Sequence, residues 1–498
     1  MACRGSKRLQ CDDRRCRPEV LVLGSAMASS GPTSSRIWSI GLSIAKWTRD
    51  CCLSRVLPLH EGELGFPPQP IGTALSYHLE GSITPRGQHS LRDLRRTLLS
   101  FEAVFILFLF AGIYKANPRF AWFPVDMTAF FGAVSLASGA IVLLGRGLAI
   151  SRAGVRLVQW GAVFTCYMAV SLVWSPSRIY GPAKVLLMGT IVLWSLGGAA
   201  LIIAPDPLRV RRFILLIQVF AVWAAVEFAL LVVRSSPGEA LLALGSTYLG
   251  LGRIFGIGII PFVLAALYRS RTFVGRSLNL GAATLLFAMM LLVGGRGPLL
   301  AVLVTLSWPV FSGIRLSAKH ILVVRRYVLW LMVLEVSVVG WIAYLVSSGN
   351  ELFMTLRRVA VLLTPGGGSS AATRVSFFEA AWLQWMERPL FGNGVGSWPL
   401  IALGLDVRGY PHNIILEVLS ELGLVGLILL LVLVGYGVSA FRVRGRSQLS
   451  PMALTLAMIF LNAALNAMVT GDIADNRFLF TALGLLPAGR VLGQSNGV

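Results

Sequence analysis

The sequence predicts an all-α, polytopic membrane protein with about twelve transmembrane helices. Apolar residues make up 56% of the 498 residues and charged residues only 13%, against about 25% in soluble globular proteins. So few charges cannot cover several soluble domains. From residue 101 onward, apolar runs suited to crossing a bilayer alternate with short polar breaks. The net charge of +22 would suggest nucleic acid in a soluble protein, but here it is first a signal of membrane orientation, and we expect no nucleic-acid partner.

Residues 1–99 differ from the rest of the chain. They hold 14 basic and 8 acidic residues and no run long enough to span, which predicts a basic, disordered cytoplasmic tail. Five of the six cysteines lie here with no zinc-ligand spacing, so we expect reduced thiols. A signal peptide around residues 20–28 and a translation start at Met27 remain alternatives.

Twelve spans follow from the apolar runs. They are expected at 101–115, 127–145, 157–174, 184–204, 213–233, 254–268, 277–293, 298–313, 327–347, 413–440, 451–469 and 478–494. Spans one to nine thus occupy residues 100–347, a long loop occupies 348–411, and spans ten to twelve occupy 412–498. The segment 239–252 fits a partial or re-entrant helix.

The basic residues orient these spans. With the tail inside, five short inside loops hold 16 basic residues, whereas the short outside loops hold half as many. The outside set is Lys115, Arg119, Arg178, Lys184, Arg234, Arg253, Arg296 and Arg477. Because basic residues concentrate on the cytoplasmic side, both termini are predicted to be cytoplasmic.

The outside loop 348–411 is long enough to need a purpose of its own. It contains a glycine-rich stretch at 365–370 and a pattern typical of an amphipathic helix at 374–388. We expect this helix to lie as a cap on the outer surface of the bundle. The run Gly-Asn-Gly-Val-Gly at 392–396 follows no strand and is interpreted as a loop turn.

Two arginines stand out on the predicted outer face. Arg296 lies in the tight turn Gly-Gly-Arg-Gly-Pro at 294–298, and Arg374 opens the loop helix. Either could simply reach the lipid headgroups or solvent. Both could instead bind phosphate oxygens, because a guanidinium keeps its charge and offers two-point hydrogen bonding.

Span ten begins with further polar residues. His412 is the only histidine predicted outside, and Asn413, Glu417 and Glu421 follow at intervals of four, on one helix face. Carboxylates within a membrane helix need a polar cavity or a partner, so Glu417 either serves a site or pairs with an arginine. A histidine that titrates near neutrality can take a proton from a sugar hydroxyl.

The last outside turn holds Asp472, Asp475 and Arg477. The two aspartates could bind a metal, but capping of the next helix and pairing with Arg477 is the favoured interpretation. Glu227 and Glu335 are also ionisable residues inside spans, and the sequence does not name their partners.

These motifs resemble the O-antigen ligase family. The resemblance rests on Phe-Gly-Asn-Gly-Val-Gly-Ser-Trp at 391–398, the segment 410–426 with its His-Asn, Glu and Glu-x-Gly-x-x-Gly pattern, the arginine turn at 294–298 and the last turn at 471–477. It covers about residues 100–494. The superfamily also contains O-antigen polymerases, which this pattern does not separate from ligases, and the long tail departs from it.

The resemblance implies a GT-C-type, metal-independent, inverting glycosyltransferase without a cofactor. Its donor would be a glycan on undecaprenyl diphosphate, and its acceptor a sugar hydroxyl on lipid A–core or on a growing chain, at the periplasmic face of the bacterial inner membrane. Arg296 and Arg374 would hold the diphosphate and His412 would activate the acceptor. The expected substrate-binding residues are Asn413, Glu417, Asp472, Asp475 and Arg477.

Rival functions remain. An O-antigen or exopolysaccharide polymerase is the nearest alternative. A polytopic transporter or flippase is the main rival of another class, although the two halves show no evident repeat and the polar residues gather at one face. A non-catalytic membrane scaffold would give no reason for Arg296, Arg374 and His412 to converge.

Overall fold

The computed structural model describes residues 97–147, 150–270, 272–317, 320–324, 369–441 and 450–494, together with seven single residues between 325 and 368 (336, 337, 340, 344, 355, 358 and 361). The chain divides into two units after residue 82, and the described residues all belong to the second, Ile83–Val498. Most of the predicted tail, most of span nine with Glu335, and the glycine-rich stretch at 365–370 except for its last two residues lie outside the described residues.

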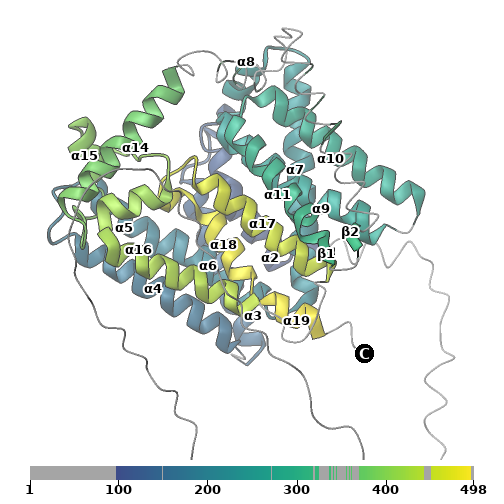
Figure 1. Ribbon diagram of the computed structural model, residues 1–498, viewed down its shortest axis with the longest axis horizontal. Coiled ribbons are helices and arrows are strands. Elements are labelled where there is room, and N and C mark those ends of the chain that lie inside the picture. The colour runs from purple at the N-terminus through teal and green to yellow at the C-terminus, as the bar shows by residue number, and fades with distance from the viewer. Residues whose placement is uncertain are drawn as a thin grey trace, which may run out of the picture. The chain divides into compact units, whose positions relative to one another are not determined.

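Helices account for nearly all of the described structure (Figure 1). The first group is α2 (Phe101–Phe110), α3 (Met127–Gly145), α4 (Arg152–Ser171), α5 (Tyr180–Leu187), α6 (Leu193–Gly197), α7 (Pro207–Val232), α8 (Pro237–Ala243), α9 (Tyr248–Leu264), α10 (Phe273–Val293) and α11 (Arg296–Gly313). The second is α14 (Ser369–Glu387), α15 (Ser397–Leu403), α16 (Ile414–Phe441), α17 (Pro451–Ala467), α18 (Arg477–Leu485) and α19 (Ala488–Gln494).

Six of these helical segments are long and apolar enough to cross a membrane, counted over the described residues. They are Met127–Gly145, Tyr180–Ile203, Pro207–Val232, Tyr248–Arg269, Phe273–Val293 and Ile414–Phe441. Three shorter apolar helices, Phe101–Ile113, Arg296–Trp308 and Pro451–Ala467, match predicted spans one, eight and eleven. A multi-pass membrane protein is therefore the architecture, although twelve crossings remain a prediction.

Several predicted elements have a different shape. Span four consists of α5 and α6, joined through a short π-helical turn at Met188–Val192, and a second π-helical turn at Gly198–Ile203 follows α6. Span twelve is broken into α18 and α19 at Pro487, which cannot donate the helical hydrogen bond. The predicted partial helix at 239–252 is the short α8 followed by the start of α9.

One antiparallel hairpin departs from the all-helical prediction within the described part of the chain. Strands β1 (Ile314–Ser317) and β2 (His320–Val324) pair where a plain inside loop was expected. β1 alternates apolar and polar residues, and β2 is rich in the β-branched residues that favour strands.

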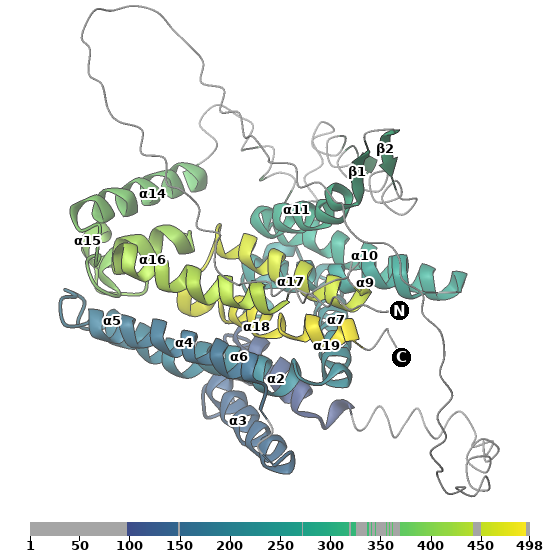
Figure 2. The same ribbon diagram turned by 60° about the horizontal axis from the view of Figure 1, so that its bottom comes forward.

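Two groups of helices pack side by side (Figures 1 and 2). Helix α9 contacts α7, α10, α11 and α17, and most of its residues are buried. Helix α16 packs on α4, and α14 lies alongside α16. The predicted cap helix is therefore confirmed as a helix, beginning five residues earlier than expected and ending at Glu387.

Residues predicted on the same side of the membrane form polar contacts with one another. Arg146 pairs with Asp206 at 2.9 Å and Arg209 pairs with Glu102 at 2.7 Å, and all four residues come from turns predicted inside or from the adjoining end of span one. Residues from turns predicted outside meet one another instead, as described below. These contacts are compatible with the predicted alternation of turns, which itself stays a prediction.

The glycine run at 392–396 is a loop pressed between helices. A Cβ atom on Gly394 would lie 2.4 Å from the Ser175 Cα, and the φ of Gly394 is 89°. Gly394 also donates its backbone N–H to the Glu421 carbonyl at 2.8 Å. The loop fits against α16 where Gly423 (φ 67°) interrupts the helical backbone, so the glycines serve close packing.

Candidate functional site

The segment between α15 and α16 carries His412 and is held at both ends. Asp406 accepts hydrogen bonds from the Ser177 hydroxyl at 2.6 Å and from the backbone N–H groups of residues 178–180, at the start of α5. Burial opposes ionisation, but these hydrogen bonds lower the pKa of Asp406 to about 2. At the other end, Asn413 accepts from the N–H groups of Ile415 and Leu416 and so caps α16.

His412 is the one non-glycine residue with positive φ (62°) in the part of the chain that the structure describes. This left-handed conformation costs about 1–2 kcal/mol for a residue with a Cβ atom, and strain of this kind gathers at functional sites. The ring stacks on Phe377 with centroids 6.2 Å apart and meets the Tyr410 ring edge-on at 4.7 Å. Its Nδ1 atom is buried and has no hydrogen-bond partner among the described residues.

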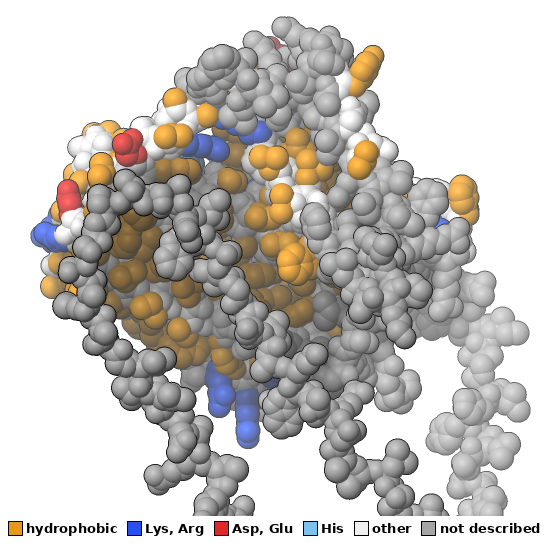
Figure 3. Space-filling model, in the orientation of Figure 1, with side chains coloured by type: hydrophobic (Ala, Val, Ile, Leu, Met, Phe, Trp, Pro, Cys, Tyr) orange, Lys and Arg blue, Asp and Glu red, His pale blue; other side chains and the backbone are white. Residues whose placement is uncertain are grey.

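Burial and then the charge of Arg374 lower the pKa of His412 to about 4. The ring is therefore neutral at pH 7 and keeps a nitrogen lone pair free to accept a proton. Arg374 lies in α14, close enough to act electrostatically on both His412 and Arg296. Figure 3 shows basic side chains grouped between α14 and α11, the helices that carry these two arginines.

A third arginine joins them. Arg296 donates from Nη1 to the Arg358 carbonyl and from Nη2 to the Ser370 hydroxyl, both at 3.3 Å. Arg358 donates to the Gly294 carbonyl at 3.2 Å, and its guanidinium lies 4.3 Å from the centre of the Tyr248 ring. Over the described residues, none of the three arginines forms an ion pair with a carboxylate. Sequence reasoning missed Arg358, because it lies in the long loop with no motif around it.

A buried ion network lies between α5 and α16. The Lys184 ammonium is fully buried in α5 and donates to Glu417 at 2.5 Å and Glu421 at 2.8 Å, and an Asp472 oxygen is 4.0 Å away. Tyr180 donates its hydroxyl proton to Asp472. The predicted arginine partner of Glu417 is thus a lysine, and Lys184, counted as an outside-loop residue, is a core residue.

The same network fixes the last turn of the chain. Glu417 accepts the backbone N–H of Ile473 at 3.1 Å, and Asp472 caps the next turn through the N–H of Ala474 at 2.7 Å. Capping by Asp472 agrees with the favoured interpretation. Asp475, however, pairs with Arg408 and not with Arg477. Glu227, whose partners the sequence could not name, accepts from Tyr114 at 2.8 Å and Arg119 at 3.0 Å.

A cavity of about 590 Å³ opens next to His412. Tyr410 lines it, and so do Arg253, Tyr248, Asp475 and Arg477. The predicted residues thus fall into three places: His412 with Arg296 and Arg374, Asp475 and Arg477 in the cavity, and Glu417 and Asp472 enclosed around Lys184. Asn413 lies at the junction, where its side chain caps α16.

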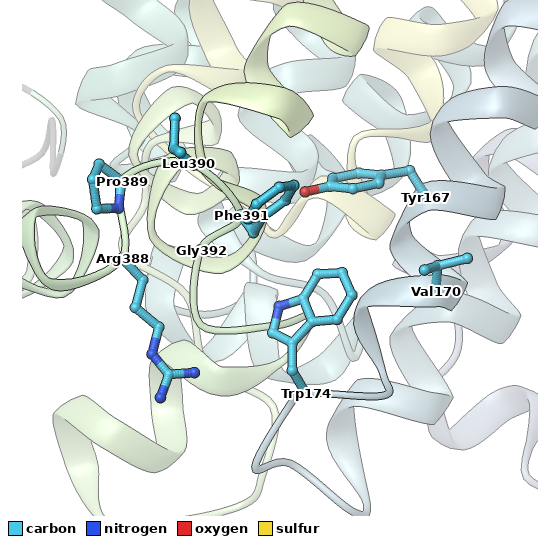
Figure 4. A pocket seen from close by; sticks show the side chains of 8 residues that line it. All are labelled: Tyr167, Val170, Trp174, Arg388, Pro389, Leu390, Phe391 and Gly392. Atoms are coloured by element: carbon cyan, nitrogen blue, oxygen red, sulfur yellow. The ribbon is translucent and has the colours of Figure 1, made fainter.

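A second cavity, of about 690 Å³, lies between α4 and the segment 388–392 (Figure 4). Tyr167, Trp174 and Phe391 give it aromatic walls, and Arg388 is the one charged side chain among its described lining residues. Phe391 and Gly392 belong to the motif at 391–398, but none of the predicted catalytic or substrate-binding residues lines this cavity, and its apolar walls offer little to hold a diphosphate. Among the described residues, no three His, Cys, Asp or Glu side chains gather as a metal site would need.

The comparisons agree with the resemblance seen in the sequence. The model of the O-antigen ligase family matches residues 281–431. This stretch includes Arg296, Arg358, Arg374 and His412 and ends within α16, before the turn at 471–477. No curated protein matches the chain.

Proposed function

Because residues 281–431 carry the domain of the O-antigen ligase family, we propose that this membrane protein is an O-antigen ligase-like glycosyltransferase. It would move a glycan from undecaprenyl diphosphate to a sugar hydroxyl of lipid A–core. One observation carries the proposal: the strained, neutral His412 lies beside arginines that have no carboxylate partner among the described residues.

The arginines supply the site for the donor diphosphate. Arg296 and Arg374 hold fixed positive charge where the leaving diphosphate gains negative charge, and such placement is worth a few kcal/mol in a transition state. The two guanidiniums repel each other when the site is empty, so a bound dianion would relieve that repulsion.

His412 acts as the general base. An oxygen of the acceptor hydroxyl attacks the anomeric carbon, the bond from that carbon to the diphosphate oxygen breaks with its electron pair, and the hydroxyl proton passes to the imidazole. Attack opposite the leaving group inverts the anomeric centre. A bound diphosphate would also offset the charge of Arg374 and raise the basicity of the ring toward its ordinary value.

The site lies at one end of the bundle, where turns predicted outside meet. We therefore assign it to the periplasmic face of the bacterial inner membrane, with both termini in the cytoplasm. The support is the excess of basic residues in the opposite turns.

Gene deletion with glycolipid analysis tests this function. We expect loss of polymer on lipid A–core, with long lipid-linked chains retained. Single-repeat products would instead identify a polymerase, and unchanged surface glycan with altered transport would favour a flippase.

Complementation assigns the residues. His412→Ala and Arg296→Gln should both fail to restore the polymer, whereas the exposed Arg234→Gln should restore it. Full restoration by both site variants, expressed at the level of the unmodified protein, would refute the site.

A further inference from the structure

The cavity beside His412 has its own set of charges. Arg253 from α9, Arg408 from the loop before α16 and Arg477 from the start of α18 line it together with a single carboxylate, Asp475. Three arginines and one aspartate leave a net charge of +2. None of the three arginines belongs to the group of Arg296, Arg358 and Arg374.

Asp475 cannot neutralise this excess. It pairs with Arg408, the most exposed of the three arginines. Arg253 is half-buried and donates from Nη2 to the Thr470 carbonyl at 2.7 Å, but its buried Nε atom has no partner among the described residues. Arg477 forms no hydrogen bond or ion pair with the described residues through its side chain and lies 5.7 Å from the centre of the Phe108 ring.

Withdrawing a guanidinium from water costs several kcal/mol unless an anion or hydrogen bonds compensate. The carboxylates of Asp475 and Asp126 attract the Arg477 guanidinium electrostatically, but neither is close enough to form an ion pair with it. The cavity is wide enough for a sugar, and Tyr248 and Tyr410 add aromatic faces to its wall. An anionic group on a ligand that enters the cavity would therefore meet two guanidiniums, those of Arg253 and Arg477, that pair with no carboxylate among the described residues.

The cavity adjoins the reacting centre. The Tyr410 ring forms part of its wall and lies 4.7 Å from the His412 ring, centre to centre. The donor diphosphate already has Arg296 and Arg374, which do not line this cavity. A second group of arginines next to the base thus fits the second substrate.

We propose that this cavity binds the acceptor glycan through an acidic group on a sugar, a carboxylate or a phosphate, and that Arg477 and Arg253 contact it. The proposal rests on the proposed function and adds the chemical class of the acceptor. An acidic sugar held here would bring a neighbouring hydroxyl to His412.

Direct binding tests this proposal. Three trisaccharides that differ only in the last residue, glucose, glucuronic acid or glucose 6-phosphate, are titrated against the full-length protein in nanodiscs. At least one acidic probe should bind about tenfold or more tightly than the neutral one, as one charge-assisted contact allows. Its preference should weaken as salt rises.

Variants assign the preference to the cavity. Arg477→Gln should reduce the difference between acidic and neutral probes to twofold or less, Arg477→Lys should retain part of it, and Arg234→Gln should leave it unchanged. If Arg477→Gln fails to fold, Arg408→Gln on the exposed loop serves instead: it lowers the net charge of the cavity from +2 to +1 and should weaken binding of the acidic probe but not of the neutral one.

Two results would overturn the proposal: equal binding of all three probes, or competitive displacement of the acidic probe by geranyl diphosphate, which would make this the donor site. His412→Ala should leave binding intact. A binding preference without any glycosyl transfer would therefore count against the proposed function and not against the acidic ligand site.

Discussion

Replacing Lys184 with methionine tests whether the ion network is the core that holds the site together. The Lys184 ammonium is fully buried and lies 2.5 Å from a Glu417 oxygen and 2.8 Å from a Glu421 oxygen. Removing one partner of a buried ion pair typically costs about 3–5 kcal/mol, because the remaining charge stays buried without compensation. We expect the lower end, about 3 kcal/mol, since carboxylates left alone can take up protons.

Reversible unfolding in mixed detergent micelles, followed by tryptophan fluorescence as the fraction of SDS rises, measures this change in the free energy of unfolding. Lys115→Met is the matched control. Lys115 also pairs with a carboxylate, that of Asp126, but its side chain is 67% exposed, so its loss should cost no more than about 1 kcal/mol.

A triple variant separates charge from packing. Adding Glu417→Gln and Glu421→Gln to Lys184→Met removes the uncompensated carboxylates and should recover part of the lost stability. If the free energy of unfolding of Lys184→Met lies within about 1 kcal/mol of that of the unmodified protein, the ion network does not hold the site together.

Three further predictions concern the site and its supports. The pKa of His412 is lowered to about 4, and the ring must be unprotonated to act as a base. The acid limb of the pH profile of kcat/KM, which reports the free enzyme, should therefore have its midpoint near pH 4. A midpoint near pH 6.5 would show an unperturbed histidine. Gly394→Ala should lower stability by more than about 1–3 kcal/mol, because a Cβ atom is strained at its φ of 89° and would also clash with Ser175. Gly404→Ala has a similar φ but open space and should cost less, so equal losses in detergent unfolding would contradict this packing. Asp406→Ala should cost about 1–2 kcal/mol by unfolding at pH 7. The pKa of Asp406 in the folded protein is about 2, below its ordinary value, so the carboxylate stabilises the fold above pH 4 and this contribution is lost as the pH falls toward 2. The free energy of unfolding of Asp406→Ala should therefore fall less between pH 4 and pH 2 than that of the unmodified protein. An equal fall in both proteins would refute the lowered pKa of Asp406.

Local patterns in the sequence predicted the helices well. The second span was expected at 127–145, and α3 has those bounds. The break between α18 and α19 and the π-helical turns within span four were not foreseen, because hydropathy averages over a window and does not register one proline or a single widened turn. The hairpin at 314–324 was not foreseen, because its two short strands lie in a stretch whose basic residues predict an inside loop.

The candidate site was predicted as a set of residues but not as an arrangement. Arg296, Arg374 and His412 could be named because charges are scarce on the predicted outer face. Lys184 was assigned to a loop, although it is the buried partner of Glu417, because the boundary of an apolar run does not show which way a side chain points. Arg358 could not be found, since only the fold brings its residue next to Gly294 and Tyr248.

The proposed role of His412 is to take the proton from the acceptor hydroxyl during glycosyl transfer. Transfer in a purified system tests this role, with the full-length protein in nanodiscs, a glycan on undecaprenyl diphosphate and a lipid A–core acceptor. His412→Ala should lower kcat by about 10²–10⁴-fold while donor binding is retained, as expected for loss of a general base. Transfer by His412→Ala at the rate of the unmodified protein would contradict a general-base role for His412.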